Sequence, residues 1–168
     1  MGEPRKVDTQ RWRQEITTYL SDFPRQFKAL EYAMSVFGDD FDFQEFKAAY
    51  ESADDMEAYN RAQALERAVS RVQNYVGDLA IAGVKLAGLE TTAADGGPAQ
   101  RAFVNLKAAG VIDGSLARKL KKAQEGRKDI EHAYGSLPAG EVHRAALQVH
   151  ESSLDFIRSY RDWIEEFR

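Results

Sequence analysis

The segment from Arg127 to Tyr134, which reads RKDIEHAY, holds the side chains of this sequence best suited to chemistry. Histidine titrates near neutral pH, so His132 could act as a general acid or a general base. Arg127 lies five residues earlier and could stabilise developing negative charge through charge-assisted hydrogen bonds. Tyr134 adds a phenolic hydroxyl two residues after the histidine. This segment is therefore the candidate functional site.

Arg127 lies where the pattern of its own predicted helix calls for an apolar residue. The apolar row of that helix consists of Leu116, Leu120, Ala123, Ile130 and Tyr134. A guanidinium within such a row costs free energy unless it is paired, exposed in a cleft or placed at an interface. One alternative is a structural ion pair with Glu131, one turn further on. Tyr134 likewise has two interpretations, an exposed hydroxyl in a cleft or a core aromatic ring.

Arg127 and His132 do not share a face of a regular helix. At about 100° per residue, His132 points about 140° away from Arg127. The two side chains meet only if the helix distorts near its end, if the arginine swings round, or if a second chain contributes. The structural alternative is that His132 caps or solvates the helix end.

Basic residues are concentrated in one part of an acidic chain. The protein has 168 residues and a formal charge of −4, yet residues 101–128 hold eight basic and two acidic side chains. This segment carries +6, as a local phosphate-binding surface would require, and a solvated helix is the simpler alternative. An acidic stretch at residues 39–57 holds eight carboxylates against Lys47. It is typical of a solvated surface with helix caps, or of a guard that competes with a polyanion.

The elements that must position these residues are helices. Helix formers dominate and alternating runs of β-branched residues are missing, so the sequence predicts an all-α protein. Its four prolines are expected at helix starts and ends. The predicted helices run from about Asp8 to Phe23, from Pro24 to Gly38, from Asp42, from Ser52–Asp55 onward, from Pro98 to Gly110, from Asp113–Ser115 to Gly135, and from Pro138 onward.

Two of these helices carry regular apolar faces. In the longest helix, residues spaced alternately by four and three share one face: Leu65, Val69, Val72, Val76, Leu79, Gly83 and Leu86. In the last helix, a row recurs every seven residues: Val142, Val149, Phe156 and Trp163. Such faces are typical of core packing, and the last one also fits an oligomer interface.

Several classes of site are absent from the sequence. There is no cysteine, which excludes disulfides, thiolate metal sites and cysteine nucleophiles. The common motifs of metalloproteases, nucleoside triphosphatases, dinucleotide-binding proteins and serine hydrolases do not occur. No apolar run is long enough for a membrane span, and the first fifteen residues lack the apolar stretch of a signal peptide. We therefore expect a soluble, cytoplasmic protein without a metal or cofactor.

The pattern R-x4-H-x-Y near the end of a helix, followed by a long aromatic-rich last helix, resembles the HEPN superfamily, and most closely its HepT-like toxin branch. The resemblance covers roughly residues 56–166. It implies an up-and-down helical bundle at residues 54–168, with residues 1–53 as an N-terminal helical extension. One departure is Lys128, because many members carry a small polar residue, often asparagine, after the arginine.

The resemblance also implies an activity, that of a metal-independent endoribonuclease whose homodimer gathers the motifs of both chains in one cleft. Arg127 and His132 would be its catalytic residues, and Lys121, Lys122 and Lys128 would hold flanking phosphates of the RNA. The partner of such toxins is a nucleotidyltransferase antitoxin of the MNT type, which would add AMP to Tyr134.

Two other functions remain open at this stage. The chain could be a non-catalytic HEPN-like module that binds a nucleotidyltransferase or a nucleotide. It could also be a plain helical dimerisation protein in which Arg127 forms a structural ion pair.

Overall fold

The computed structural model describes residues 6–91, 96–133 and 135–167, with the side chains of residues 6–8 left out. This part of the chain forms six α-helices and contains no strand, which confirms the all-α prediction. The helices are α1 (Lys6–Ser35), α2 (Phe43–Tyr50), α3 (Met56–Ala87), α4 (Pro98–Ala108), α5 (Gly114–Ala133) and α6 (Ala139–Ile164), followed by a 3₁₀ turn, η1 (Glu165–Phe167).

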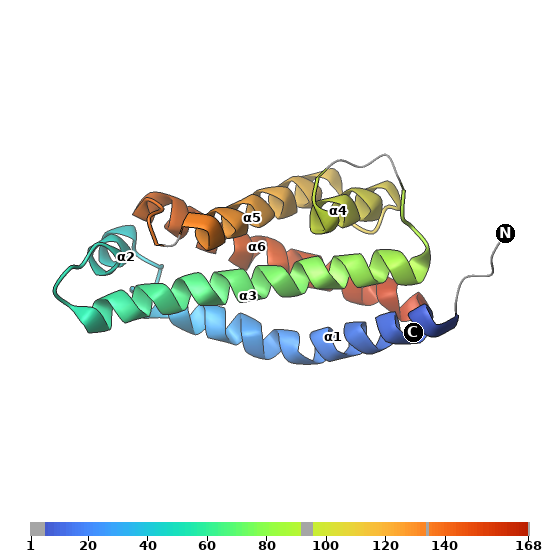
Figure 1. Ribbon diagram of the computed structural model, residues 1–168, viewed down its shortest axis with the longest axis horizontal. Helices are drawn as coiled ribbons and strands as arrows, with labels where there is room; N and C mark the ends of the chain where they lie inside the picture. Colours follow the sequence, from blue (N-terminus) through green and yellow to red (C-terminus); the bar gives the residue numbers. More distant parts are fainter. Residues whose placement is uncertain (1–5, 92–95, 134, 168) are drawn as a thin grey trace.

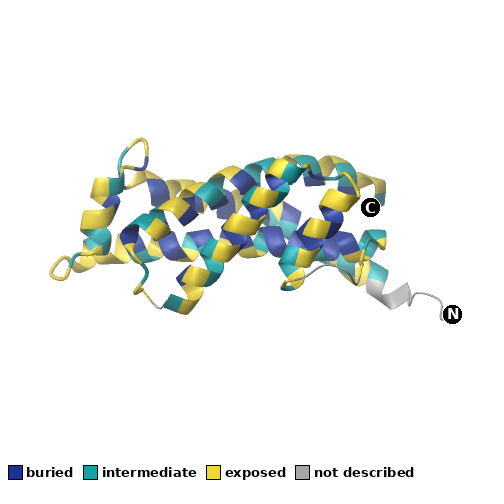
Figure 2. Ribbon diagram, turned by 90° about the horizontal axis from the view of Figure 1, so that it is seen from above, coloured by how far each residue is buried: buried dark blue, intermediate teal, exposed yellow. Residues whose placement is uncertain are grey.

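The helices pack as an elongated bundle around α3 (Figure 1). On one side α1 runs along α3, and on the other side α4 and α5 follow one another, with α6 packed against both α3 and α5. The start of α1 and the end of α6 lie at the same end of the bundle, where Arg13 Nε donates to the carbonyl of Phe167 (3.1 Å). Figure 2 shows the buried residues along the inner faces of the helices and the exposed ones outside.

The first helix differs from its prediction, because α1 continues without interruption through Pro24. Proline removes one backbone donor from a helix and normally ends or bends it. Here Pro24 is exposed, whereas Phe23 and Phe27 on either side of it are buried against the rest of the bundle. Apolar packing of α1 along α3 therefore outweighs the local cost, and one helix replaces the predicted two.

The apolar row of α3 forms the centre of the core, as predicted. Its members from Leu65 to Leu79 are fully buried, and at Gly83 the helix comes close to α6. A Cβ atom on Gly83 would lie 2.6 Å from the hydroxyl oxygen of Tyr160. That hydroxyl donates to the carbonyl of Leu79 (2.6 Å). The missing side chain thus makes room for a buried tyrosine.

The apolar row of α6 serves the core of the same chain. Val142, Val149 and Phe156 are fully buried, and Trp163 is half-buried beside Tyr160. The core interpretation of this row is therefore confirmed. Buried residues of α1 and α2 belong to the same hydrophobic cluster as those of the later helices. The division of the chain at residue 53 stays a prediction.

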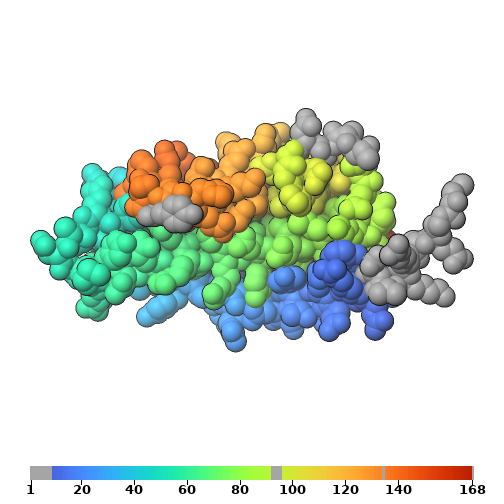
Figure 3. All heavy atoms as spheres, in the orientation of Figure 1, coloured from blue at the N-terminus to red at the C-terminus, as the bar shows by residue number. Residues whose placement is uncertain are grey.

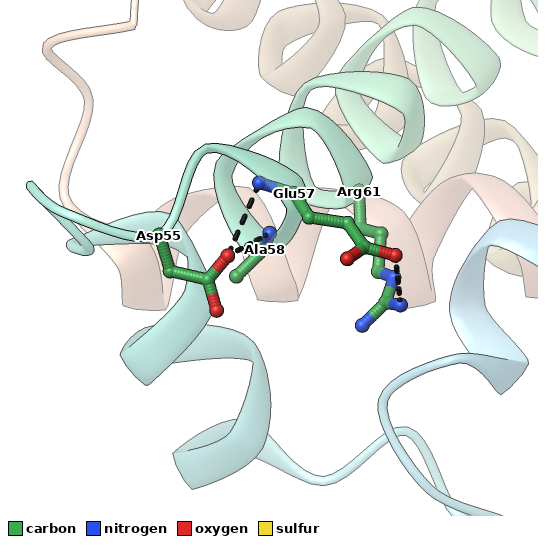
Figure 4. A network of polar contacts seen from close by, with 4 residues as sticks. All are labelled: Asp55, Glu57, Ala58 and Arg61. Carbon is green, nitrogen blue, oxygen red and sulfur yellow. Dashed lines mark hydrogen bonds and ion pairs between the residues drawn. The ribbon is translucent and has the colours of Figure 1, made fainter.

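The acidic stretch contains two helix caps, which satisfy backbone donors at helix starts. Asp42 caps α2 by accepting from the backbone N–H of Glu45 (2.9 Å). Asp55 caps α3 by accepting from the backbone N–H groups of Glu57 and Ala58 (both 3.1 Å), as Figure 4 shows. Ser52, predicted to share in opening α3, lies before the helix and accepts from the N–H of Asp55 (3.1 Å).

None of the helices in the described part of the chain combines the length and the apolar composition that a membrane span requires.

Candidate functional site

Arg127 lies in the second half of α5, on the side that faces α3. Only 14% of its side chain is exposed, and its guanidinium donates to Glu131 Oε2 at 2.5 Å. Its Nε atom is buried and has no hydrogen-bond partner. The structural ion pair considered from the sequence is therefore present, but it leaves one buried donor of the arginine unused.

His132 lies apart from this pair. The helix stays regular through Ala133, so the distortion that would turn His132 toward Arg127 does not occur in α5. The His132 side chain is exposed and lines neither of the two pockets beside Arg127 and Glu131. A single chain thus does not bring Arg127 and His132 together. Tyr134 lies outside the described residues.

The three predicted phosphate-binding lysines also separate into two groups. Lys128 is half-buried and lines the same pocket as Arg127. Lys121 and Lys122 are exposed on α5 and do not line that pocket. Lys128 is therefore the lysine that the fold places next to the arginine.

Two pockets flank the ion pair, and Asn74 and Asp78 of α3 line both of them. The larger one, the α1 pocket, has a volume of about 450 Å³ and lies between α3, Tyr19 of α1, and Ile130 and Glu131 of α5. Figure 3 shows that the atoms of α4 and α5 lie on one side of α3 and those of α1 on the other.

The smaller pocket, the α4 pocket, has a volume of about 210 Å³ and lies between α3, α5 and the first residues of α4. A Cβ atom on Gly77 would lie only 3.2 Å from Cβ of Ala99, so a glycine in α3 lets the start of α4 approach closely. Gln73 and Gln124 form its buried floor, where Gln73 Nε2 donates to Gln124 Oε1 (3.0 Å).

Sequence reasoning did not single out the residues that α3 contributes to these pockets. The available signal was the polar row Ser70, Asn74 and Asp78, spaced by four beside the apolar row of α3. Such a row is equally typical of a solvated helix face. Burial raises the pKa of the Asp78 carboxyl above its ordinary value, and a hydrogen bond with Tyr19 and, to a smaller extent, the positive charge of Arg127 offset that shift only in part. Arg127 thus pairs with Glu131 and shares a pocket with Asp78.

The loop that follows α5 is held by Tyr50 of α2. The Tyr50 hydroxyl donates to the carbonyl of Leu137 (2.5 Å) and lies 3.1 Å from that of Gly135. Burial and the nearby Glu66 carboxylate raise the pKa of Tyr50 to about 12. Burial also raises the pKa of Glu66.

Replacing Glu66 with glutamine is expected to stabilise the protein at neutral pH by about 1 kcal/mol, since an isosteric amide avoids burying a charge. Because the folded pKa is raised, the folded state binds more protons than the unfolded state above the ordinary pKa of 4.5, and stability falls as pH rises. The gain should therefore vanish below that pH. Urea unfolding at pH 3.5 and pH 7 measures it, with exposed Glu125→Gln as the control. A gain that is independent of pH contradicts the prediction.

The other two histidines belong to the fold. His143 Nε2 lies 2.8 Å from the carbonyl oxygen of Phe41, and its ring stacks on that phenylalanine with centroids 4.2 Å apart. His150 stacks on Phe27 and lies 3.3 Å from a carboxylate oxygen of Glu31. Both join α6 to residues 27–41, which leaves His132 as the exposed histidine.

Within the described residues, no three histidine, aspartate or glutamate side chains gather in a position that could hold a metal ion. The chain matches none of the protein-family models, curated proteins or solved structures with which it was compared. The resemblance to the HEPN superfamily accordingly rests on the residues of the motif and on its place in the chain.

Proposed function

We propose that this protein is a HEPN-like, metal-independent endoribonuclease and the toxin component of a toxin–antitoxin or defence pair. The observation that carries the proposal concerns Arg127. Its guanidinium is largely buried between α3 and α5, and its Nε atom has no hydrogen-bond partner. Lys128 lies beside it, and His132 is exposed at the end of the same helix. Cationic donors with unused capacity suit a phosphate group of RNA.

The reaction is attack by a ribose 2′-hydroxyl on the adjacent phosphorus. A base takes the proton of that hydroxyl, the new O–P bond forms, and the bond to the 5′-oxygen breaks as an acid protonates the leaving oxygen. The products are a 2′,3′-cyclic phosphate and a 5′-hydroxyl end. Arg127 would stabilise the extra negative charge of the phosphorane, and Lys121, Lys122 and Lys128 would hold neighbouring phosphates.

A homodimer is part of this proposal. One imidazole cannot serve as base and acid in the same step, whereas two copies related by a two-fold axis supply two. His132 is exposed and makes no hydrogen bond with the rest of the described chain, so it is accessible to a second copy. A sedimentation experiment that finds only monomers at the concentration of an active assay contradicts the dimeric site.

A second candidate is a non-catalytic HEPN-like module that binds a nucleotidyltransferase or a nucleotide. The observation that favours it is the short ion pair between Arg127 and Glu131, which neutralises the guanidinium within one chain. In this function Arg127 would be a structural residue and His132 dispensable. An MNT-type antitoxin as partner, and AMP transfer to Tyr134, fit both candidates.

Replacing His132 with alanine is expected to reduce RNA cleavage in EDTA by about 10²–10⁴-fold, the usual contribution of general acid–base catalysis. The assay uses purified protein and labelled RNA, and detects the cyclic phosphate end. His150→Ala is the matched control and should keep full activity, because that imidazole contacts Glu31 and Phe27. Wild-type protein that leaves RNA intact at micromolar concentration contradicts the nuclease. Equal cleavage by His132→Ala contradicts the role of the histidine.

Co-purification with a nucleotidyltransferase, together with a His132→Ala variant that matches the wild type in every assay, would select the binding module instead. Mass spectrometry of the Tyr134→Phe variant after incubation with such a partner and ATP locates the AMP group. Retention of the added mass would exclude Tyr134 as the acceptor.

A further inference from the structure

The α4 pocket places a positive side chain against an uncapped helix start. Gly97 is the N-cap of α4, and Pro98 is the first helical residue. Because glycine has no side chain, it cannot accept a hydrogen bond from the backbone N–H groups of the first turn. The free N–H groups and the helix dipole make such a helix start attractive to anions. A Cβ atom on Gly97 would lie 3.5 Å from Nζ of Lys128, so the lysine ammonium reaches the same point.

The charged side chains around the start of α4 favour binding of an anion. Lys128 forms no ion pair with the described part of the chain. Arg127 is the second positively charged side chain in the lining of this pocket. Asp78 is the acidic side chain in the lining of this pocket. Glu131, which pairs with Arg127, lines the α1 pocket instead. The charged side chains that line the α4 pocket sum to one positive charge, and because Arg127 is paired with Glu131, Lys128 supplies the unpaired cation next to the backbone donors.

The buried floor of the α4 pocket indicates which chemical group a bound ligand would carry beside its anionic group. Gln73 is fully buried at the floor of the pocket, and its Oε1 atom has no hydrogen-bond partner. Its Nε2 atom is already used by Gln124. A buried carbonyl oxygen without a partner costs free energy, so a ligand that donates a hydrogen bond from inside the pocket would be favoured. A ribose hydroxyl next to a phosphate group supplies such a donor.

We propose that the α4 pocket binds a ribose phosphate. The phosphate lies between Lys128 and the start of α4, and a ribose hydroxyl donates to Oε1 of Gln73. As a subsite that holds an RNA phosphate next to the cleaved linkage, it rests on the proposed function. A free nucleotide carries the same group, and the experiment distinguishes these two sources.

The test uses two nearly isosteric caps at position 97. The backbone of Gly97, with φ −69° and ψ 172°, is open to both aspartate and asparagine, and both side chains cap helix starts. Gly97→Asp places a carboxylate in the proposed phosphate position, whereas Gly97→Asn provides a similar cap without charge. Neither variant should lower the melting temperature. Titration calorimetry measures binding of ribose 5-phosphate and of inorganic phosphate to each.

Ribose 5-phosphate should bind the wild type more tightly than inorganic phosphate, and Gly97→Asp should weaken it at least about tenfold, as loss of one charged hydrogen bond would. Gly97→Asn occupies the same backbone donors without adding a charge, so it should weaken binding less than Gly97→Asp does. Lys128→Gln should weaken binding as Gly97→Asp does, while Lys107→Gln at the other end of α4 should not. Equal binding by Gly97→Asp and Gly97→Asn, or tighter binding of inorganic phosphate, overturns the proposal.

RNA and nucleotide are separated by competition on the His132→Ala protein. Displacement of ribose 5-phosphate by a ten-nucleotide RNA supports the RNA subsite. If AMP displaces ribose 5-phosphate and the RNA does not, the assignment to RNA is overturned in favour of a free nucleotide. Ribose phosphate binding by a protein without RNA cleavage overturns the nuclease and supports the pocket. RNA cleavage at the wild-type rate by Gly97→Asp overturns the pocket as an RNA subsite and leaves the nuclease standing.

Discussion

Replacing Phe46 with alanine is expected to lower the free energy of unfolding by about 4 kcal/mol, because it removes a fully buried aromatic ring. Phe46 is the buried residue of α2, and its ring packs against those of Phe37 and Phe41, with centroids 5.3 and 5.7 Å away. Its loss leaves α2 without its anchor. Urea unfolding followed by circular dichroism measures the change.

The same substitution should also release the loop after α5, because Tyr50 lies on α2 and holds the carbonyl of Leu137. Hydrogen exchange at residues 135–137 should therefore accelerate in Phe46→Ala. Tyr50→Phe separates the two effects, since it removes the hydroxyl and keeps the ring. Exposed Lys47→Ala is the control on the same helix. Stability within about 1 kcal/mol of the wild type in Phe46→Ala contradicts the packing argument.

Replacing Gly83 with leucine is expected to cost about 3 kcal/mol or more, the upper range for overpacking a core. A Cβ atom there would lie 2.6 Å from the Tyr160 hydroxyl and 3.0 Å from the Trp163 ring, so α3 and α6 must move apart. Leucine favours helices, and the cost therefore arises from packing alone. Thermal unfolding measures it, with Ala64→Leu on the exposed side of α3 as a control close to the wild type.

A double substitution tests the cause. Tyr160→Phe removes the oxygen nearest to the new Cβ and also the hydrogen bond to the carbonyl of Leu79. In that background Gly83→Ala should cost less than it does alone, with a coupling of about 0.5 kcal/mol or more. Strict additivity of the two changes would mean that the hydroxyl does not determine the strain.

The sequence was sufficient to predict three features of the fold, because each depends on local chemistry. These are the all-α class, most helix starts and the buried face of α3. Asp42 and Asp113 accept from backbone N–H groups three residues later, as short polar side chains at helix starts do. The spacing of Leu65, Val69 and Val72 predicts one buried face without knowledge of what covers it.

Features that depend on distant parts of the chain could not be read in this way. Continuation of α1 through Pro24 is decided by packing against α3, and propensity alone gives the opposite answer. Phe41, expected in a loop, is buried with φ +52° and stacks on His143, a contact across about a hundred residues. The pairing of the start of α4 with Lys128 depends on how closely α3 lets α4 approach at Gly77.

Within the candidate site, the sequence indicated Arg127 and its ion pair with Glu131 because both follow from positions on one helix. It could not indicate Gln73, since one glutamine within an amphipathic helix has no signature of its own. The meeting of Arg127 and His132 stays a prediction, because it requires a second copy of the chain.

Pro24 leaves the carbonyl of the residue one turn earlier without its helical donor, midway along a thirty-residue helix. One bond is therefore missing from the ladder of backbone hydrogen bonds there, so fraying of the residues before Phe23 meets less backbone resistance than fraying of an unbroken helix. Tyr19, a wall of the α1 pocket, lies in that first part of α1. Ile16 and Leu20 of the same part are buried in the shared core, so access to Glu131 from that side depends on how firmly these two side chains pack.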